Sequence, residues 1–132
     1  MRIKLESIAV SDQDHALKFY TDIMEFVVKQ DEPMGDARLI TLAAPDEPDG
    51  ALLMLEPAGE HPATKTYKQA LKSEGIPFTA FEVDDIHAEY ARLQDRGVTF
   101  TMAPMDTGVS TAAILDDTCG NLIMIYEPTG PS

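Results

Sequence analysis

The chain has 132 residues, 44% of them hydrophobic, which is enough to bury the core of one compact domain. Its formal net charge of −13 argues against nucleic acid and anionic membrane surfaces as partners, because both are negatively charged. A single cysteine, Cys119, excludes an internal disulfide and a multi-cysteine zinc site, and no run resembles a signal peptide or a transmembrane helix, so we expect a cytoplasmic protein.

The first part of the chain predicts a β-α-β-β-β unit. Residues 2–10 read as a strand, and Ser11 or Asp12 is expected to cap the helix that follows. The apolar face of this helix repeats at helical spacing and consists of Ala16, Phe19, Tyr20 and Ile23. Three more strands are expected, over residues 26–29, 38–43 and 51–55.

Residues 57–77 differ in composition and are predicted to link two modules. Pro57, Gly59 and Pro62 open this segment, and Gly75 and Pro77 close it. Between them, residues 65–73 are polar and predict a short surface helix.

The remaining residues repeat the order of the first unit. Residues 78–83 predict a strand, and Asp84 or Asp85 is expected to cap a helix that Gly97 ends in a left-handed conformation. The apolar face of the helix consists of Ile86, Tyr90 and Leu93. Strands are expected over residues 98–102, 109–115 and 122–126, with a turn over 116–121 before the last one.

The two modules also share local sequence. Residues 50–55 reappear about 70 positions later as residues 120–125, and residues 10–16 have a counterpart at 83–88. Two similar units that are each too small to bury an apolar face are expected to share a core and to leave a cleft. We therefore predict one α+β domain: two tandem β-α-β-β-β modules, 1–56 and 78–128, that form an open, eight-stranded, mainly antiparallel curved sheet with a central cleft.

Three stretches carry a resemblance to a known family. They are Val10-x-Asp12-x3-Ala16-x2-Phe19-Tyr20, then Phe81-Glu82-Val83-Asp84-Asp85, and finally Asp116-Asp117-x2-Gly120-Asn121. In this order, and with the duplication, they resemble the vicinal oxygen chelate superfamily. Its members include glyoxalase I, a lyase, as well as extradiol dioxygenases and the fosfomycin and bleomycin resistance proteins.

The resemblance also concerns the metal centre of this superfamily. Metal-dependent members usually carry four ligands, one on each inner strand, around a divalent cation that acts as a Lewis acid. Carried over by motif spacing, these positions are Leu5, Met54, Phe78 and Met124. None is a ligand for a hard cation, since a methionine thioether is a soft donor. The resemblance therefore implies that no cofactor is bound, and a divalent metal only if this alignment is wrong.

Other side chains that can bind a metal also have a simpler interpretation as surface residues. Glu56 and Glu82 share strand faces with Met54 and Phe78 and hold a metal if both point inward; at strand ends they are more simply solvated. His15 and His87 are expected on the outer faces of helices. His61 lies in the linker, which can fold over a cleft.

Strand alternation predicts which side chains line the cleft. We expect Leu5, Ser7, Met54, Glu56, Phe78, Ala80, Glu82, Met124 and Tyr126. The methionines either fill gaps in the core or form an adaptable apolar pocket, and both interpretations remain open. No catalytic residue is assigned, since no nucleophile–histidine pattern is present and Cys119 in its turn is best interpreted as a bystander.

Three functions fit this sequence. The first is a small-molecule-binding protein of the bleomycin resistance type, with an acidic rim that favours cationic ligands and with Arg38 the one candidate cation in the cleft. The second is a glyoxalase- or dioxygenase-like enzyme with a non-standard metal or an acid–base site such as Glu82 and Tyr126. The third is an assembly partner with a collapsed pocket. A homodimer is expected in each case, because open sheet edges need covering.

Overall fold

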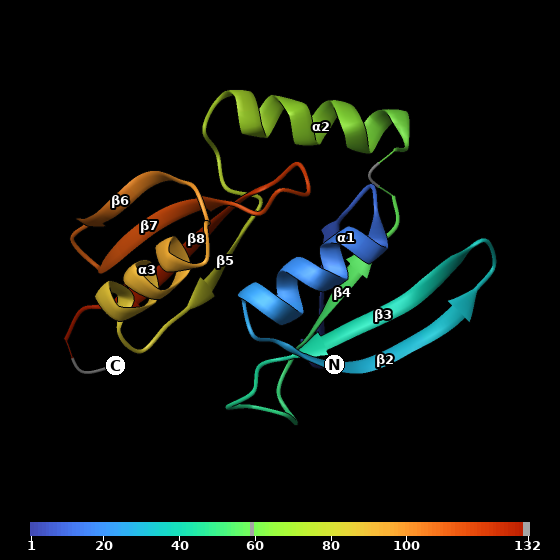
Figure 1. Cartoon of the computed structure of the whole chain (residues 1–132), viewed down its shortest axis with the longest axis horizontal. Coiled ribbons are helices and arrows are strands. Elements are labelled where there is room, and N and C mark those ends of the chain that lie inside the picture. The colour runs from blue at the N-terminus through green and yellow to red at the C-terminus, as the bar shows by residue number, and fades with distance from the viewer. Residues whose placement is uncertain (59, 131–132) are drawn as a thin grey trace. The chain divides into compact units, whose positions relative to one another are not determined.

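The computed structural model describes residues 1–58 and 60–130. Gly59 of the predicted linker, Pro131 and Ser132 lie outside the described residues. The chain divides into two compact units, residues 1–66 and 67–132 (Figure 1). The boundary falls inside the helix α2, within the predicted linker. That the two modules form a single domain stays a prediction.

Unit 1 has the predicted β-α-β-β-β order. Its elements are β1 (Leu5–Ala9), α1 (Gln13–Lys18), the π-helical turn η1 (Phe19–Ile23), β2 (Val27–Met34), β3 (Ala37–Ala43) and β4 (Leu52–Glu56). The four strands form one sheet in the order β1-β4-β3-β2, with β1 parallel to β4 and the other neighbours antiparallel.

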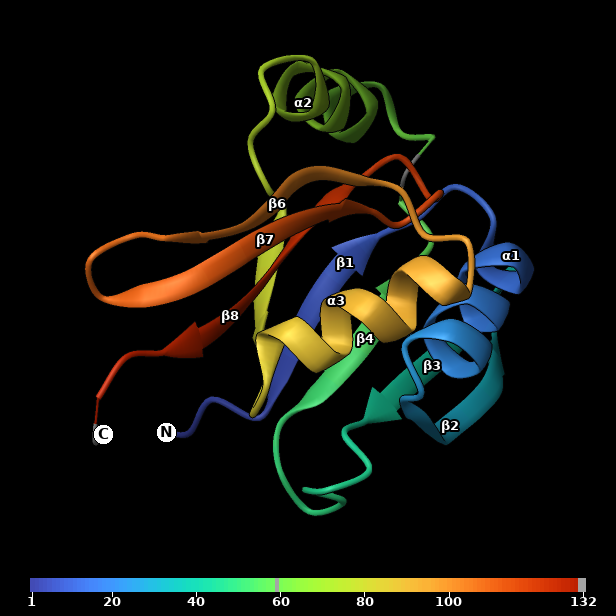
Figure 2. The same cartoon turned by 60° about the vertical axis from the view of Figure 1, so that its left-hand side comes forward.

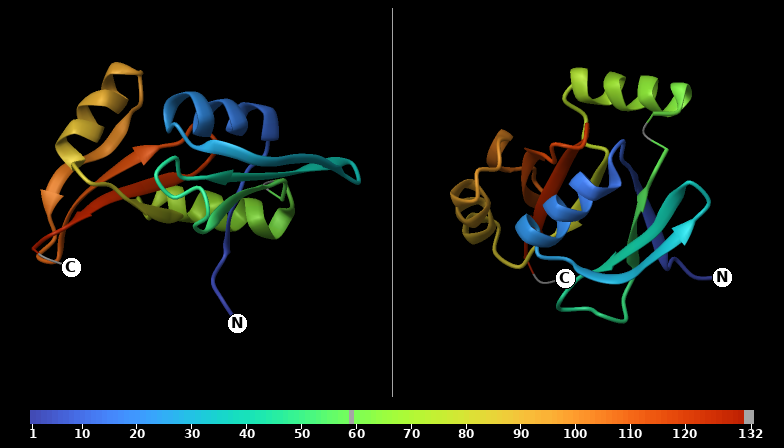
Figure 3. Two further views of the ribbon diagram at one scale, coloured as in Figure 1. Left: turned by 90° about the horizontal axis from the view of Figure 1, so that it is seen from below. Right: turned by 45° about the vertical axis from the view of Figure 1, so that its right-hand side comes forward.

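The second strand of unit 1 is longer than the sequence predicted. β2 runs to Met34, which pairs with Ala37 across a turn where Gly35 has a φ of +59°. Every residue of β2 is exposed, so its polar second half carries no apolar alternation that could identify it as a strand. The hairpin of β2 and β3 reaches out from unit 1 (Figure 3).

The core of unit 1 lies between α1 and one face of this sheet (Figures 1 and 3). Asp12 is the N-cap, and its side chain accepts a hydrogen bond from the His15 amide at 3.1 Å. Of the predicted helical face, Ala16, Phe19 and Tyr20 are buried and Ile23 is half-buried, and its second half has π-helical hydrogen bonding. The buried residues of the helix and sheet include Ala16, Phe19, Tyr20, Ile8, Ile40, Leu42 and Leu55.

Unit 2 contains the same order of elements after α2 (Figure 2). The helix α2 (Pro62–Ser73) spans the boundary between the units, and the elements after it are β5 (Thr79–Glu82), α3 (Ile86–Asp95), β6 (Phe100–Asp106), β7 (Ser110–Asp116) and β8 (Leu122–Pro128). The sheet order is β5-β8-β7-β6, again with one parallel pair, β5 and β8. The α+β class is thus confirmed, with the eight strands hydrogen-bonded as two mixed sheets of four.

The core of unit 2 lies under α3. Asp85 caps this helix by accepting from the Ala88 amide at 3.1 Å, Ile86 and Leu93 are buried, and Gly97 has a φ of +86°. β6 starts two residues later than predicted, because the Val98 amide still bonds back to Leu93 and closes the helix.

The linker helix α2 is longer than predicted and is not simply a surface helix. It begins at Pro62, which suits a first helical turn. Lys68 is buried, and the ring of Tyr67 makes an edge contact with Phe78 at 6.0 Å. None of the helices in the described ranges is long and apolar enough to span a membrane.

Candidate functional site

Each sheet has one face under a helix and one face that its helix leaves open. In unit 1, β1 pairs with β4 so that Ser7 lies beside Met54, and Ile8 lies beside Leu55. Ile8 and Leu55 are fully buried on the α1 side, whereas Ser7 is exposed and Met54 is half-buried. Ser7 and Met54 therefore lie on the open face of the sheet.

The other two predicted residues of unit 1 share this open face. Leu5 pairs with Leu52, and Glu56 pairs with Ala9, each two positions from the Ser7–Met54 pair. Leu5 is 51% exposed, and Glu56 is half-buried with its backbone oxygen bonded to the Val10 amide. We call this surface of Leu5, Ser7, Met54 and Glu56 open face 1.

Unit 2 has a corresponding open face. Ala80 pairs with Met124, Glu82 pairs with Tyr126, and Phe78 precedes them with its amide bonded to the Leu122 oxygen. Ala80 and Glu82 are exposed, and the other three are half-buried. We call this surface of Phe78, Ala80, Glu82, Met124 and Tyr126 open face 2. That the two open faces line one cavity stays a prediction.

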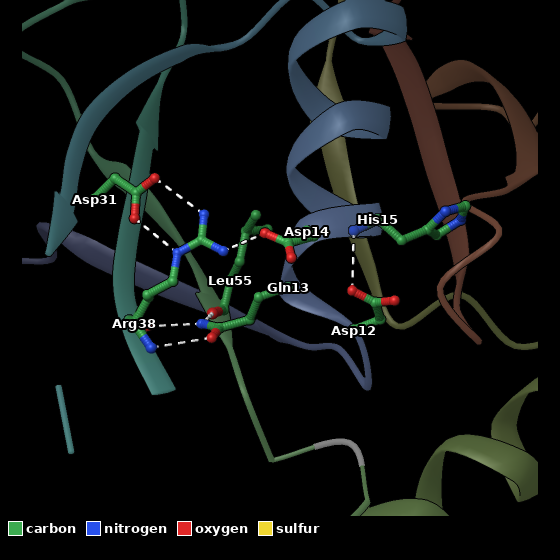
Figure 4. A network of polar contacts seen from close by, with 7 residues as sticks. All are labelled: Asp12, Gln13, Asp14, His15, Asp31, Arg38 and Leu55. Atoms are coloured by element: carbon green, nitrogen blue, oxygen red, sulfur yellow. Dashed lines mark hydrogen bonds and ion pairs between the residues drawn. The ribbon is translucent and has the colours of Figure 1, made fainter. Parts of the chain in front are cut away.

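Arg38 lies on the side of the unit 1 sheet that faces α1, where its side chain points toward Asp14 (Figure 4). This is the side opposite to open face 1. Its Nε and Nη2 donate to the Asp31 carboxylate at 2.9 and 3.0 Å, and its Nη1 pairs with Asp14 of α1. The hydrogen bonds and charge of Arg38 hold the pKa of Asp31 below its usual value, and its two carboxylate partners raise the pKa of Arg38. The guanidinium is thus engaged beside α1 and does not lie on open face 1.

The sequence contained the signal that places Arg38. It stands two and four residues before Ile40 and Leu42, both buried on the α1 side, so strand alternation assigns it to that side. The Gln13 side chain ties α1 to β3 and β4, because it hydrogen-bonds to the backbone of Arg38 and to the Leu55 oxygen (Figure 4).

The three histidines lie outside the strands that form the open faces. His15 and His87 are exposed, as predicted for the outer sides of helices. His61 stands just before α2, where its Nδ1 accepts a hydrogen bond from the Ala63 amide at 3.3 Å. The His61 side chain therefore accepts a backbone hydrogen bond in the first turn of α2.

The thiol of Cys119 is unsuited to nucleophilic chemistry at neutral pH. Burial, followed by the negative charge of Asp117, raises its pKa to about 12. A thiol with this pKa is almost entirely protonated at pH 7, and the thiolate is the reactive form. The interpretation of Cys119 as a bystander is consistent with this environment.

The turn before β8 holds buried polar groups whose role sequence reasoning missed. Asp117 is fully buried, and its carboxylate accepts from the Cys119 amide and from both the amide and the side chain of Asn121. Lys68 of α2, 5% exposed, donates to the Cys119 oxygen at 2.9 Å. The motif Asp116-Asp117-x2-Gly120-Asn121 was the available signal, and it predicted only a turn.

The donor set does not fit the metal centre found in metal-dependent superfamily members. The motif-matched residues Leu5, Met54, Phe78 and Met124 offer no oxygen or nitrogen ligand for a hard cation. Across residues 1–58 and 60–130, no three His, Cys, Asp or Glu side chains gather in a group that could hold a metal ion. The side chains at these positions therefore do not support the metal-assisted chemistry of those members.

Comparison with known proteins defines the class. A model of the Glyoxalase/Bleomycin resistance protein/Dioxygenase superfamily matches residues 2–125, so the chain belongs to this superfamily. The resemblance drawn from the sequence is confirmed.

Particular relatives extend this assignment. The chain is 54% identical over 127 residues to the uncharacterized protein YurT of Bacillus subtilis strain 168, and the match covers 96% of this chain and 99% of that protein. Among solved structures, UcmS2 matches with a TM-score of 0.81 and 29% identity over 96% of this chain and 97% of its own. TnmS3, described as an antibiotic binding protein from Streptomyces sp. CB03234, matches with a TM-score of 0.78 and 27% identity over 98% and 97%.

Proposed function

We propose that the chain is a small-molecule-binding protein that works without a divalent metal. The observation that carries the proposal is the pair of half-buried methionines, Met54 and Met124. Each lies on an open sheet face at a position where the resemblance places a metal ligand in metal-dependent members. The likeness to the antibiotic-binding protein TnmS3 supports the same function.

The open faces favour a ligand with an apolar body and a positive or hydrogen-bond-donating group. Apolar contact supplies roughly 25 cal/mol per Å² of buried area. A charge-assisted hydrogen bond to Glu56 or Glu82 adds about 1.5–3 kcal/mol if water is excluded from it. Anions such as phosphonates or glutathione conjugates bind these faces less well, because Arg38 is engaged with Asp31 and Asp14.

A homodimer in the cytoplasm is part of the same proposal. The edge strands β2 and β6 expose Val27, Val28 and Met105 along unpaired backbone. Association of two copies covers such edges. Sedimentation at micromolar concentration should give about twice the chain mass of 14.4 kDa, and a monomer mass contradicts this part.

The binding proposal is tested by a thermal-shift screen of cationic, neutral and anionic aromatic compounds. We expect hits among the cationic and neutral compounds, and the affinity of each of these hits should fall in Met54→Gln and in Met124→Gln. Met34→Gln is the matched control, since Met34 is exposed near the hairpin tip, and it should leave affinity unchanged. Equal affinity in all three variants contradicts the proposal.

The absence of a resident metal is tested separately. After incubation with Zn, Ni, Mn or Fe(II) and desalting, elemental analysis should find well under one equivalent of metal. One retained equivalent that is lost in Glu82→Ala would reverse the proposal in favour of an enzyme.

A second function rests on one further observation. Glu82 and Tyr126 are direct neighbours across β5 and β8, both on open face 2, which places a carboxyl and a phenol side by side. Such a pair suits general acid–base catalysis. If a screening hit is chemically converted, Glu82→Gln should abolish turnover and leave binding within a few-fold, which distinguishes catalysis from binding alone.

A further inference from the structure

A pocket lies at the end of the sheet of unit 1, where β1 and β4 begin. Its volume is about 260 Å³. It is lined by Lys4, Lys29, Pro48, Asp49, Gly50 and Leu52. Leu52 supplies half-buried apolar surface, and the Leu52 amide bonds to the Lys4 oxygen, which holds the two strand starts together.

The two lysines of this pocket differ from four other cations of the chain that are held in ion pairs. Arg38, Lys65, Lys72 and Arg92 are each within ion-pair distance of a carboxylate. Within the described ranges, Lys4 and Lys29 make no ion pair, although the chain has 23 acidic residues and 10 basic ones. Asp49 is the one carboxylate among the lining residues, and the Glu47 carboxylate lies beside Gly50, with its Oε2 2.9 Å from the place of an added Cβ.

The corresponding position in unit 2, at the start of β8, is different. Gly120 and Leu122 correspond to Gly50 and Leu52, and here α2 packs onto the turn. A Cβ added to Gly120 would lie only 3.2 Å from the Lys68 ammonium. This ammonium donates a hydrogen bond to the Cys119 oxygen. In unit 2 the helix α2 therefore covers the turn before the last strand, and the Lys68 ammonium is bonded within the unit.

We propose that the pocket of unit 1 binds a small organic anion. The ammonium groups of Lys4 and Lys29 bind its carboxylate, since charge-assisted hydrogen bonds are the strong ones. Its apolar body lies against Leu52 and Pro48. A monoanion suits this pocket better than a dianion, because Asp49 and the neighbouring Glu47 repel a second negative charge. This site is separate from the Met54 and Met124 positions of the proposed function.

The test is an NMR titration of the whole chain with sodium benzoate, followed through backbone amides. We expect saturable shifts at Lys4, Lys29, Gly50 and Leu52. The double variant Lys4→Gln/Lys29→Gln should weaken benzoate binding at least tenfold. The control is Lys18→Gln on α1, a lysine that makes no ion pair within the described ranges, and it should change affinity less than twofold. Benzylamine, similar in shape but cationic, should produce no saturable shifts at these four amides.

Two results overturn the proposal. One is an equal loss of affinity in the double variant and in Lys18→Gln, which reveals a general charge effect. The other is a set of shifts that spares all four amides. Met124→Gln separates this proposal from the proposed function, since it should leave benzoate affinity unchanged while lowering the affinity of hits on the open faces.

Discussion

Unit 1 and unit 2 approach their last strand through turns that begin from related sequence and end in different environments. In unit 1, residues 45–49 are exposed, and Gly50 is the first half-buried position. In unit 2, Asp117 and Asn121 are buried, and α2 reaches the turn through Lys68 and through the ion pair of Lys72 with Asp116 at 3.3 Å. The same supersecondary unit thus has one open turn and one closed turn.

This difference teaches which features belong to the repeat and which depend on its surroundings. Both units keep an aspartate N-cap, Asp12 and Asp85, because capping needs only neighbouring residues. Both keep a parallel pair of first and last strands. Burial of the turn is different, since it requires α2, which occurs once in the chain.

The largest expected effect is at the carboxylate that organises the closed turn. Asp117→Ala leaves two backbone amides and the Asn121 side chain without their buried acceptor and should cost about 3 kcal/mol. The corresponding residue of the open turn, Glu47, is exposed, so Glu47→Ala should cost less than about 0.5 kcal/mol. Urea unfolding measures both, and equal losses would remove the contrast between the turns.

The next effect concerns the helix that closes the turn. Lys68→Met keeps the length of the side chain but removes the ammonium that bonds to Cys119, and it should cost about 2 kcal/mol. Lys65→Met is the matched control on the same helix, because its ion pair with Glu60 is exposed and 3.6 Å long. It should cost no more than about 0.5 kcal/mol. If Lys65→Met lowers the free energy of unfolding as much as Lys68→Met does, the bond of Lys68 to the turn is not the cause of the loss.

A smaller contrast is expected at the paired glycines. Gly120 has a φ of +90°, and an added Cβ would lie 3.2 Å from the Lys68 ammonium, so Gly120→Ala should cost about 1–2 kcal/mol. The φ of Gly50 is not positive, although an added Cβ would lie 2.9 Å from Oε2 of Glu47 and 3.2 Å from its backbone oxygen. Gly50→Ala therefore loses stability through crowding alone, without the strain of a left-handed residue, and should cost less than Gly120→Ala by the same unfolding assay. The reverse order would contradict the assignment of strain to Gly120.

Local patterns predicted most of the fold. The apolar spacing of α1 and α3, the caps at Asp12 and Asp85 and the left-handed Gly97 depend on near neighbours in sequence, and all are observed. The second half of β2 was missed because its residues are polar and exposed, so only the register with β3 defines it.

The candidate site was predictable in part. The strand register pairs Ser7 with Met54 and Ala80 with Met124, as alternation groups them, and that these residues line one cavity stays a prediction. The burial of Lys68 was not predictable, because a lysine in a polar helix is normally solvated and only the packing of α2 on the turn removes it from water. The lysine pocket was also missed, since its members come from three separate segments.

The smallest expected effect is at the exposed contact that joins α1 to the sheet in unit 1. Unit 2 makes the corresponding connection with a half-buried carboxylate, Glu127, which accepts from the Ile86 amide at 2.9 Å. In unit 1, Arg38 joins Asp14 of α1 to Asp31 of β2 in an exposed network. Exposed ion pairs contribute little, so Arg38→Met should shift the urea midpoint less than the Asp117, Lys68 and Gly120 variants above.

The pH dependence of this effect identifies its origin. The pKa of Asp31 is lowered in the folded chain from its ordinary value of 3.8, so its contribution is fully present above that pH and is lost as the pH falls through the lower, folded value. The difference between the wild type and Arg38→Met should therefore be constant from about pH 6 to pH 7 and should narrow below about pH 4. The control Lys18→Met should show no such narrowing. A difference that stays constant down to pH 3 would mean that Arg38 stabilises unit 1 through packing of its stem, and salt at 0.5 M should then leave the difference unchanged as well.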